Sequence, residues 1–329
     1  MSLVSRRAFA LSLGLSALAP ALKAGAQTDL AYPSKPIKLV VPFPPGGGAD
    51  FLGRLLAQKM GEALGQPIIV DNKPGAATVI GSDAVAKTAP DGHTLLLLLR
   101  DMALNPSIMA TLPYDTLKSF AWIGKAAEGP FILVVNPSVP AKSLAELAAL
   151  AKAKPGSLSY GSLGVGGLAH ISVEAMARHL GITVLHVPYK GAGPALQAAV
   201  SGEIAVTLAA LTGAIPFIRE GRLRALAVGA EKRAPQLPDV PTIGEAGGGG
   251  DTILPQYYGL AAPAGTPRPI IERINAELKR ALSLPDVVEK LAQSGIAPAH
   301  STPEALGVEM AGDIARFGKL IKALGIPPQ

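Results

Sequence analysis

The chain reads LVVPFPPGGGAD at residues 39–50, where a short apolar strand passes through a glycine-rich turn into a helix expected over residues 49–64. A second stretch of this kind, LSYGSLGVGG at residues 158–167, leads into a helix expected over residues 167–180. A helix that begins on glycines presents free N–H groups and the positive end of its dipole, which suits an anion. The two turns therefore predict two lobes that close on one anionic ligand. The alternative is that both turns are tight connections that bind nothing.

Apolar strand candidates alternate with amphipathic helices on both sides of these turns. This alternation predicts an α/β fold with open parallel sheets covered on both faces, arranged as two doubly wound lobes with a ligand cleft between them. The expected strands are 37–41, 68–70, 94–99, 131–135, 157–160, 184–187, 204–208, 225–228 and 257–261. The expected helices are 49–64, 77–87, 143–152, 167–180, 192–201, 213–220, 267–283, 285–294 and 303–324.

The end of the chain is expected to return to the first lobe, because the sequence after Tyr257 offers three helices and no further clear strand. We expect residues 27–130 to form the first part of lobe 1, residues 131–256 to form lobe 2, and residues 257–329 to complete lobe 1. Strand 131–135 would lead out of the first lobe and strand 257–261 would lead back.

The first 26 residues have the pattern of an export signal peptide. Ser5-Arg6-Arg7-Ala8-Phe9 is followed by an apolar stretch over residues 8–22 and by Ala24-Gly25-Ala26, so cleavage is expected near Ala26–Gln27. The stretch is too short, and too rich in alanine, glycine and serine, for a comfortable membrane anchor. We expect an exported periplasmic protein. The pattern leaves open whether export uses the twin-arginine or the general secretory route.

Composition excludes several classes of function. The chain has no cysteine, which excludes disulfides and thiolate metal sites. Its five histidines form no His-x-x-x-His cluster, so we expect no catalytic metal. No cofactor is expected. The net charge of +6 comes from scattered basic residues and not from a basic stripe, which argues against nucleic acid as a partner.

Five motifs in order resemble the extracytoplasmic solute receptors of tripartite tricarboxylate transporters, also called Bug proteins. They are PFPPGGGAD (42–50), NKPG (72–75), HVPYKG (186–191), PDVPT (238–242) and LAAPAGTP (260–267). The resemblance covers about residues 33–326. It implies a type II-like periplasmic-binding-protein fold, a small organic carboxylate as ligand, and a membrane permease of the tripartite tricarboxylate transporter type as partner.

The resemblance also implies that backbone N–H groups of the two turns hold one carboxylate, with ordered water bridging it to the first loop. Carried onto this chain, the binding residues are Phe43, Pro44, Gly46, Gly47, Gly48 and Ala49 in the first lobe, with Ser162, Gly164, Gly166 and Gly167 in the second. The chain departs from the family pattern at three places. Gly167 stands where the family often has Ser or Thr, Arg100-Asp101 where it usually has small residues such as Gly-Thr, and Ala205 where it often has Asp.

Four further candidates follow, and three of them have two interpretations. Asp50 is either an N-terminal helix cap or a group that orients a ligand amine or water. His170 either hydrogen-bonds behind the site or lines the cleft. Tyr189 and Lys190 are expected near the cleft mouth, unless Lys190 simply pairs with a surface carboxylate.

Arg100 decides between ligand classes. It is either a surface arginine paired with Asp101 or a cleft residue that clamps a second carboxylate bidentately, which would predict a dicarboxylate. If Asp101 points inward instead, an amine-bearing ligand such as an amino acid is favoured.

These observations predict a monomeric receptor that captures a di- or tricarboxylate or related organic acid by hinge closure and delivers it to the permease. A ligand-sensing receptor for a signalling partner remains an alternative. A periplasmic hydrolase is disfavoured, because Ser162 lies in Gly-Ser-Leu-Gly and not in a Gly-x-Ser-x-Gly elbow, and the sequence names no acid–base partner for it. The sequence does not identify the carboxylate.

Overall fold

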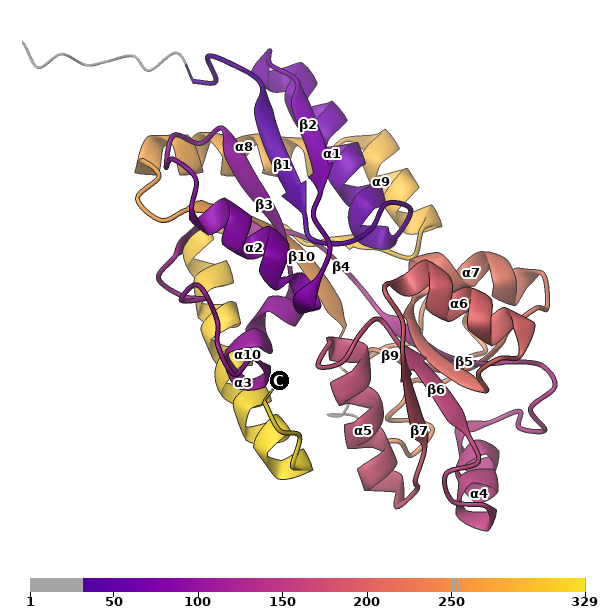
Figure 1. Cartoon of the computed structure of the whole chain (residues 1–329). Helices are drawn as coiled ribbons and strands as arrows, with labels where there is room; N and C mark the ends of the chain where they lie inside the picture. The colour runs from indigo at the N-terminus through magenta and orange to yellow at the C-terminus, as the bar shows by residue number, and fades with distance from the viewer. Residues whose placement is uncertain (1–31, 250–252, 254, 329) are drawn as a thin grey trace, which may run out of the picture. The chain divides into compact units, whose positions relative to one another are not determined.

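The chain from Pro33 onward is built around two β-sheets (Figure 1). The computed structural model describes residues 32–249, 253 and 255–328, so the expected export signal lies outside the described residues. The first sheet has the strand order β11-β4-β10-β3-β1-β2 and the second has the order β7-β6-β8-β5-β9. The first sheet is built from β1 Ile37–Val41, β2 Ile68–Asn72, β3 Thr94–Leu99, β4 Phe120–Gly129, β10 Gln256–Pro263 and β11 Ala297–Pro298. The second contains β5 Phe131–Val135, β6 Ser159–Ser162, β7 Leu185–Pro188, β8 Val206–Ala210 and β9 Arg224–Gly229.

Helices follow most strands of each sheet, which confirms the expected α/β fold with two lobes. Those of the first lobe are α1 Gly48–Leu64, α2 Val79–Ala86, α3 Asn105–Ile108, α8 Arg268–Leu282, α9 Pro285–Gln293 and α10 Pro303–Leu324. Those of the second are α4 Leu144–Ala153, α5 Leu168–Leu180, α6 Ala192–Ser201 and α7 Leu211–Arg219. Short 3-10 turns occupy Ala76–Thr78 (η1) and Arg100–Ala103 (η2). No helix within the described ranges is long and apolar enough to cross a bilayer.

Helix α1 shows how the sequence pattern becomes a packed element. Its apolar stripe is buried as expected, with Leu52, Leu56 and Met60 each at most 1% exposed. Burying one such side chain contributes about 1.5–3 kcal/mol. The helix ends at Gly65, which has the left-handed φ of +71° that glycine adopts without strain.

The expectation of purely parallel sheets is wrong. Strands β1, β2 and β3 are parallel, as are β6, β7 and β8, but β10 runs antiparallel to β3 and β4, and β5 runs antiparallel to β8 and β9. Both β5 and β10 follow a connection that leads from one sheet to the other: β4 passes through Pro130 into β5 of the second sheet, and β9 is followed by β10 of the first. A strand–helix–strand crossover within one sheet gives parallel neighbours, and neither β5 nor β10 is reached by such a crossover.

Candidate functional site

A cavity of about 330 Å³ is lined by residues of both lobes. The first lobe contributes residues 43–49, Ala77, Leu99, Asp101, Gln256 and Tyr258, and the second contributes Phe131, Leu163, Gly164, 167–169, 191–194 and Ala210. The N-terminal ends of α1, α5 and α6 are all in this lining. Backbone N–H groups at helix N-termini are suited to anions, so the cavity combines apolar walls with anion-binding ends.

The first glycine-rich turn lines the cavity with Phe43, Pro44, Gly46, Gly47, Gly48 and Ala49, all of which were expected there. Gly46 has a φ of +86°, a left-handed conformation that requires glycine or strains another residue. Gly47 is the N-cap of α1 and supplies no side chain to bind the first N–H groups of the helix. These groups therefore remain available to a ligand.

Asp50 does not line the cavity, and its expected role as a ligand contact is corrected. Its Oδ2 accepts hydrogen bonds from the Gly46 N–H and from Arg54 Nε, each 3.0 Å long, and its Oδ1 accepts one of 3.0 Å from Asn72 Nδ2. Burial alone would raise the pKa of Asp50, but these hydrogen bonds together hold it below its usual value. Asp50 thus fixes the glycine turn from behind, but the N-cap of α1 is Gly47, so the interpretation of Asp50 as the helix cap is wrong as well.

In the second turn, Gly164 and Gly167 line the cavity, whereas Ser162, Gly166 and His170 do not. The Ser162 hydroxyl donates to the Gly164 carbonyl at 2.9 Å and accepts from the Gly164 N–H at 3.2 Å. His170 Nδ1 accepts the Gly166 N–H at 3.0 Å. Ser162 and Gly166 were expected as ligand contacts, but in the structure they belong to the internal hydrogen bonds of the turn. For His170 the structure agrees with the first of its two interpretations, a hydrogen bond behind the site.

His186 also supports the second glycine-rich turn, and sequence reasoning did not identify this role. Its Nε2 lies 2.6 Å from the Ser162 hydroxyl, and its ring stacks on His170 with centroids 4.0 Å apart. Because the Ser162 proton is used on the Gly164 carbonyl, His186 Nε2 donates in this contact. The available signal was strand pairing, since β6 and β7 are parallel and place His186 beside Tyr160.

The two stacked histidines predict a loss of stability in acid. Burial lowers the pKa of His186 to about 4, with help from neighbouring His170 and against the opposing charge of Glu174. Burial also lowers the pKa of His170. A histidine whose folded pKa is depressed stabilises the fold above its unfolded pKa, and this contribution disappears as pH falls from about 6.5 towards 4. After allowance for partial solvent access to the ring, we expect a loss of about 1–2 kcal/mol.

Urea denaturation at pH 7 and pH 4.5 of the native chain and of His186→Asn checks this. Asparagine can still donate to Ser162 but carries no titrating group, so the variant is expected to show a smaller loss between the two pH values. His179→Asn, at an exposed position near the end of α5, is the matched control and is expected to behave like the native chain. Equal pH dependence in all three proteins would contradict the assignment.

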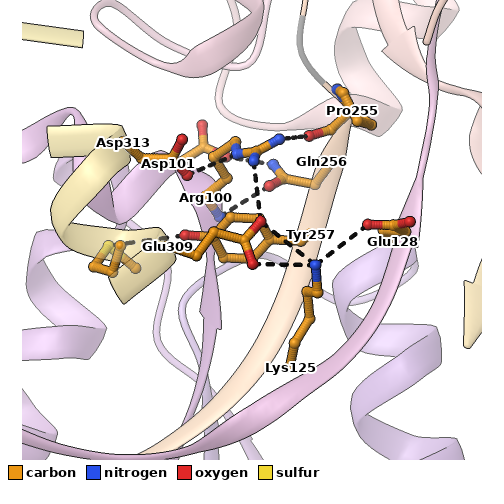
Figure 2. Close-up of polar contacts among 10 residues, drawn as sticks. Arg100, Asp101, Lys125, Glu128, Pro255, Gln256, Tyr257, Glu309 and Asp313 are labelled. Carbon is orange, nitrogen blue, oxygen red and sulfur yellow. Dashed lines mark hydrogen bonds and ion pairs between the residues drawn. The ribbon is translucent and has the colours of Figure 1, made fainter. Parts of the chain in front are cut away.

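Arg100 does not line the cavity, which contradicts the expected carboxylate clamp. Figure 2 shows its side chain beside Asp313, Glu309 and Pro255. Its guanidinium binds Asp313 Oδ2 at 2.9 Å, Glu309 Oε1 at 3.2 Å and the Pro255 carbonyl at 2.5 Å. It also lies 4.6 Å from the centre of the Tyr257 ring. The alternative of a surface pair with Asp101 is equally wrong, because Arg100 is buried among partners on α10 and beside β10.

Asp101 points the other way, into the cavity wall. Its Oδ1 accepts the N–H of Leu168 at 2.9 Å and its Oδ2 accepts from Gln256 Nε2 at 2.5 Å. Burial raises the pKa of the Asp101 carboxyl, and these two hydrogen bonds oppose the rise. Arg100 and Asp101, which are adjacent in η2, therefore have different roles: Arg100 binds carboxylates of α10, and Asp101 lines the cavity.

Tyr189 and Lys190 line an adjoining cavity of about 690 Å³ that shares Phe43, Pro44 and Gly164 with the first. The Tyr189 hydroxyl donates to Glu203 at 2.7 Å, and burial with this contact raises the pKa of Tyr189 to about 12. Lys190 is exposed and, within the described part of the chain, forms no ion pair, so its expected alternative as a surface pair is not found. Both residues therefore stand beside the main cavity and outside its lining.

Sequence reasoning did not identify the start of α6 or the polar residues of β10 as part of the cavity lining. Residues 191–194 read Gly-Ala-Gly-Pro, a glycine signal like that of the two turns, and they line the cavity. Tyr258 and Gln256 also line it, whereas Tyr257 faces Arg100 and Met310. Neighbouring residues of a strand face opposite sides, so only one of the two adjacent tyrosines can reach the cavity. Among the described residues, no cluster of His, Asp or Glu could hold a metal ion.

Solved structures with the same fold are periplasmic binding proteins. A periplasmic transporter superposes with a TM-score of 0.86 at 38% identity, over 90% of this chain and 99% of that one. Rpa4515 of R. palustris with adipate gives 0.86 at 32% identity, over 91% and 100%. MatC of Rhodopseudomonas palustris with bound malate gives 0.83 at 33% identity, over 88% and 100%.

Sequence relatives agree. A protein encoded in the tcbD-tcbE intergenic region of Pseudomonas sp. strain P51 is 40% identical over 291 residues, covering 88% of this chain and 87% of that protein. BugT of Bordetella pertussis is 36% identical over 296 residues, covering 89% and 90%. The family model described as the tripartite tricarboxylate transporter family receptor matches residues 52–326. The chain therefore belongs to the tripartite tricarboxylate transporter receptors, the family of solute-binding Bug proteins.

Proposed function

We propose that the protein is a periplasmic receptor that captures a small organic acid between its lobes and delivers it to a membrane permease of the tripartite tricarboxylate transporter type. The observation that carries this proposal is the cavity of about 330 Å³, lined by the N-terminal ends of helices from both lobes. The adipate and malate found with two relatives support an organic acid as ligand. We propose the lobe boundaries and the cleavage of the export signal as they are expected from the sequence.

The proposed carboxylate site is the first glycine-rich turn with the groups that face it. The N–H groups of Gly48 and Ala49, at the start of α1, would bind the carboxylate, with Gly164 and Gly167 closing the cavity from the second lobe. A ligand that touches both lobes favours the closed state, and the permease would recognise that state. Because this mechanism needs free movement of the lobes, we propose a monomer.

The alternatives carry less support. A sensory role uses the same ligand cavity and differs only in the partner. A hydrolase would need an accessible nucleophile, yet Ser162 is 0% exposed and its hydroxyl is committed to the turn, even though His186 lies within hydrogen-bond distance. We therefore propose a binding protein and not an enzyme.

A thermal-shift screen of the chain from Gln27 onward tests the proposal, with organic acids, amino acids and the matching amides as probes. A ligand present at 100 times its Kd stabilises the folded protein by about 2.7 kcal/mol. We expect carboxylates to raise the Tm and their amides to leave it unchanged. If folded protein, freed of any carried-over ligand, responds to none of the acids, the proposed function is wrong.

A further inference from the structure

Asp101 is the one charged side chain among the described residues that line the cavity. It lies in η2, directly after β3, and is about nine-tenths buried. The rest of the lining is glycine, alanine, proline and larger apolar residues, with Gln256 and Tyr258 as the other polar side chains. A carboxylate in such surroundings has a strong influence on which ligand can enter, because charges interact strongly where little water is present.

The contacts of Asp101 reach from the first lobe to the second. Its Oδ1 accepts the N–H of Leu168, the first residue of α5, at 2.9 Å. A Cβ atom added to Gly167, the N-cap of that helix, would lie 3.5 Å from the same oxygen. The protein's own carboxylate therefore already binds at the positive end of α5, where an anionic group of a ligand would otherwise be stabilised.

Gln256 indicates that the Asp101 carboxyl acts as a hydrogen-bond acceptor. The Oε1 of Gln256 accepts the backbone N–H of Arg100 at 2.9 Å, which orients the amide so that its Nε2 donates to Asp101. Figure 2 shows Gln256 beside both residues. With donors on both of its oxygens, Asp101 is held as an acceptor, and these hydrogen bonds oppose the rise in its pKa that burial causes.

The start of α1 has the opposite character. Asp50 binds the N–H of Gly46 and leaves the N–H groups of Gly48 and Ala49 to the cavity. The Tyr258 hydroxyl is a second donor there: Tyr258 is 3% exposed, lines the cavity and has no hydrogen-bond partner among the described residues. A Cβ atom on Gly48 would lie 3.1 Å from this hydroxyl. The cavity therefore has donors at the α1 side and an acceptor carboxylate at the α5 side.

We propose that Asp101 makes this receptor selective for a monocarboxylate that carries a hydrogen-bond donor, a hydroxyl or an ammonium group, and that it excludes dicarboxylates. The inference rests on the proposed function and narrows its ligand class. The ligand carboxylate binds at the start of α1, and its donor group faces Asp101. A second carboxylate at that position would meet a like charge in a poorly hydrated cavity, and no cationic side chain in the described lining would compensate.

Straight-chain acids of three to six carbons test the inference, each in four forms that end in a hydroxyl, an amine, a methyl group or a second carboxylate. Isothermal titration of the native chain is expected to give the tightest binding for a hydroxyl or amine form, about 10-fold or more tighter than the dicarboxylate of equal length. Asp101→Asn is expected to reduce this preference by about 10-fold or more. Asp101→Ser, which keeps an acceptor for Leu168 without the charge, is expected to do the same if the asparagine variant does not fold.

Asp313→Asn is the matched control, because it removes a buried carboxylate that binds Arg100 and lies outside the cavity lining. Its ligand preference is expected to equal that of the native chain. A native chain that prefers a dicarboxylate, or a preference unchanged by both Asp101 variants, overturns the inference and leaves the receptor function standing. Failure of every probe, together with silence in the wider screen, overturns the receptor function and the inference with it.

Discussion

Replacing Arg100 with methionine is expected to lower the free energy of unfolding by about 3–5 kcal/mol, because it leaves buried carboxylates without their cation. Arg100 binds Asp313 at 2.9 Å and Glu309 at 3.2 Å, and only 9% of the Asp313 side chain is exposed. Lys125 lies 3.1 Å from Glu309 and can compensate that carboxylate in part, but no ion pair with a second cation is found for Asp313 in the described chain (Figure 2). The loss should appear as a lower urea midpoint.

Arg268→Met is the matched control for this change. Arg268 also binds two carboxylates, Glu272 at 2.7 Å and Glu304 at 2.5 Å, but all three side chains are 59% exposed. Exposed ion pairs contribute little because water screens them, so this variant is expected to unfold like the native chain. Ligand affinity should be unchanged in both variants. Equal stability of the two variants, or a selective loss of ligand binding in Arg100→Met, would contradict the structural role.

Arg100 also shows where sequence reasoning stops. Its partners Pro255, Glu309 and Asp313 are 155 to 213 residues away along the chain. The pattern at residues 94–101 correctly predicts an apolar strand that ends in two charged residues. Which of the two faces the cavity depends on the local 3-10 turn and on β10 packed beside β3, and neither is encoded in the local pattern.

Strand β4 was missed for a related reason. Its sequence FAWIGKAAEG contains Lys125, Glu128 and two glycines, so it lacks a clear alternation of apolar and polar residues. In the structure this strand pairs with β10 and β11, and Lys125 forms ion pairs with Glu128 and Glu309. The polar residues that hide the strand in the sequence are therefore paired by tertiary contacts.

The two glycine turns were predictable because their signal is local. A strand, a run of glycines and an amphipathic helix define both the fold of the turn and the direction of its N–H groups, and both turns contribute to the cavity lining. The local signal could not show which residues of each turn line the cavity and which only support the turn. Asp50, Ser162 and His170 support the turns from behind, and this depends on partners such as Asn72 and His186 that lie in neighbouring strands.

Replacing Gly48 with valine is expected to weaken binding of the best carboxylate by about 100-fold while the protein remains folded. Gly48 is the first residue of α1, and its φ lies outside the left-handed region, so valine fits the backbone. A Cβ atom there would lie 3.1 Å from the Tyr258 hydroxyl and 3.7 Å from Thr212 Oγ1, directly in the proposed carboxylate site. Overpacking of this kind costs about 1–3 kcal/mol, which a domain of ordinary stability can bear.

Gly312→Val separates this local effect from the general effect of a β-branched residue in a helix. Gly312 lies in α10, and a Cβ atom there would have no heavy atom within 4 Å. Isothermal titration with the tightest probe of the screen should give native affinity for Gly312→Val and a strongly reduced affinity for Gly48→Val. Native affinity in Gly48→Val would mean that the carboxylate does not bind at the start of α1. The N-termini of α5 and α6, which also line the cavity, would then be the next candidates for its donors, and Asp101 already occupies the first N–H of α5.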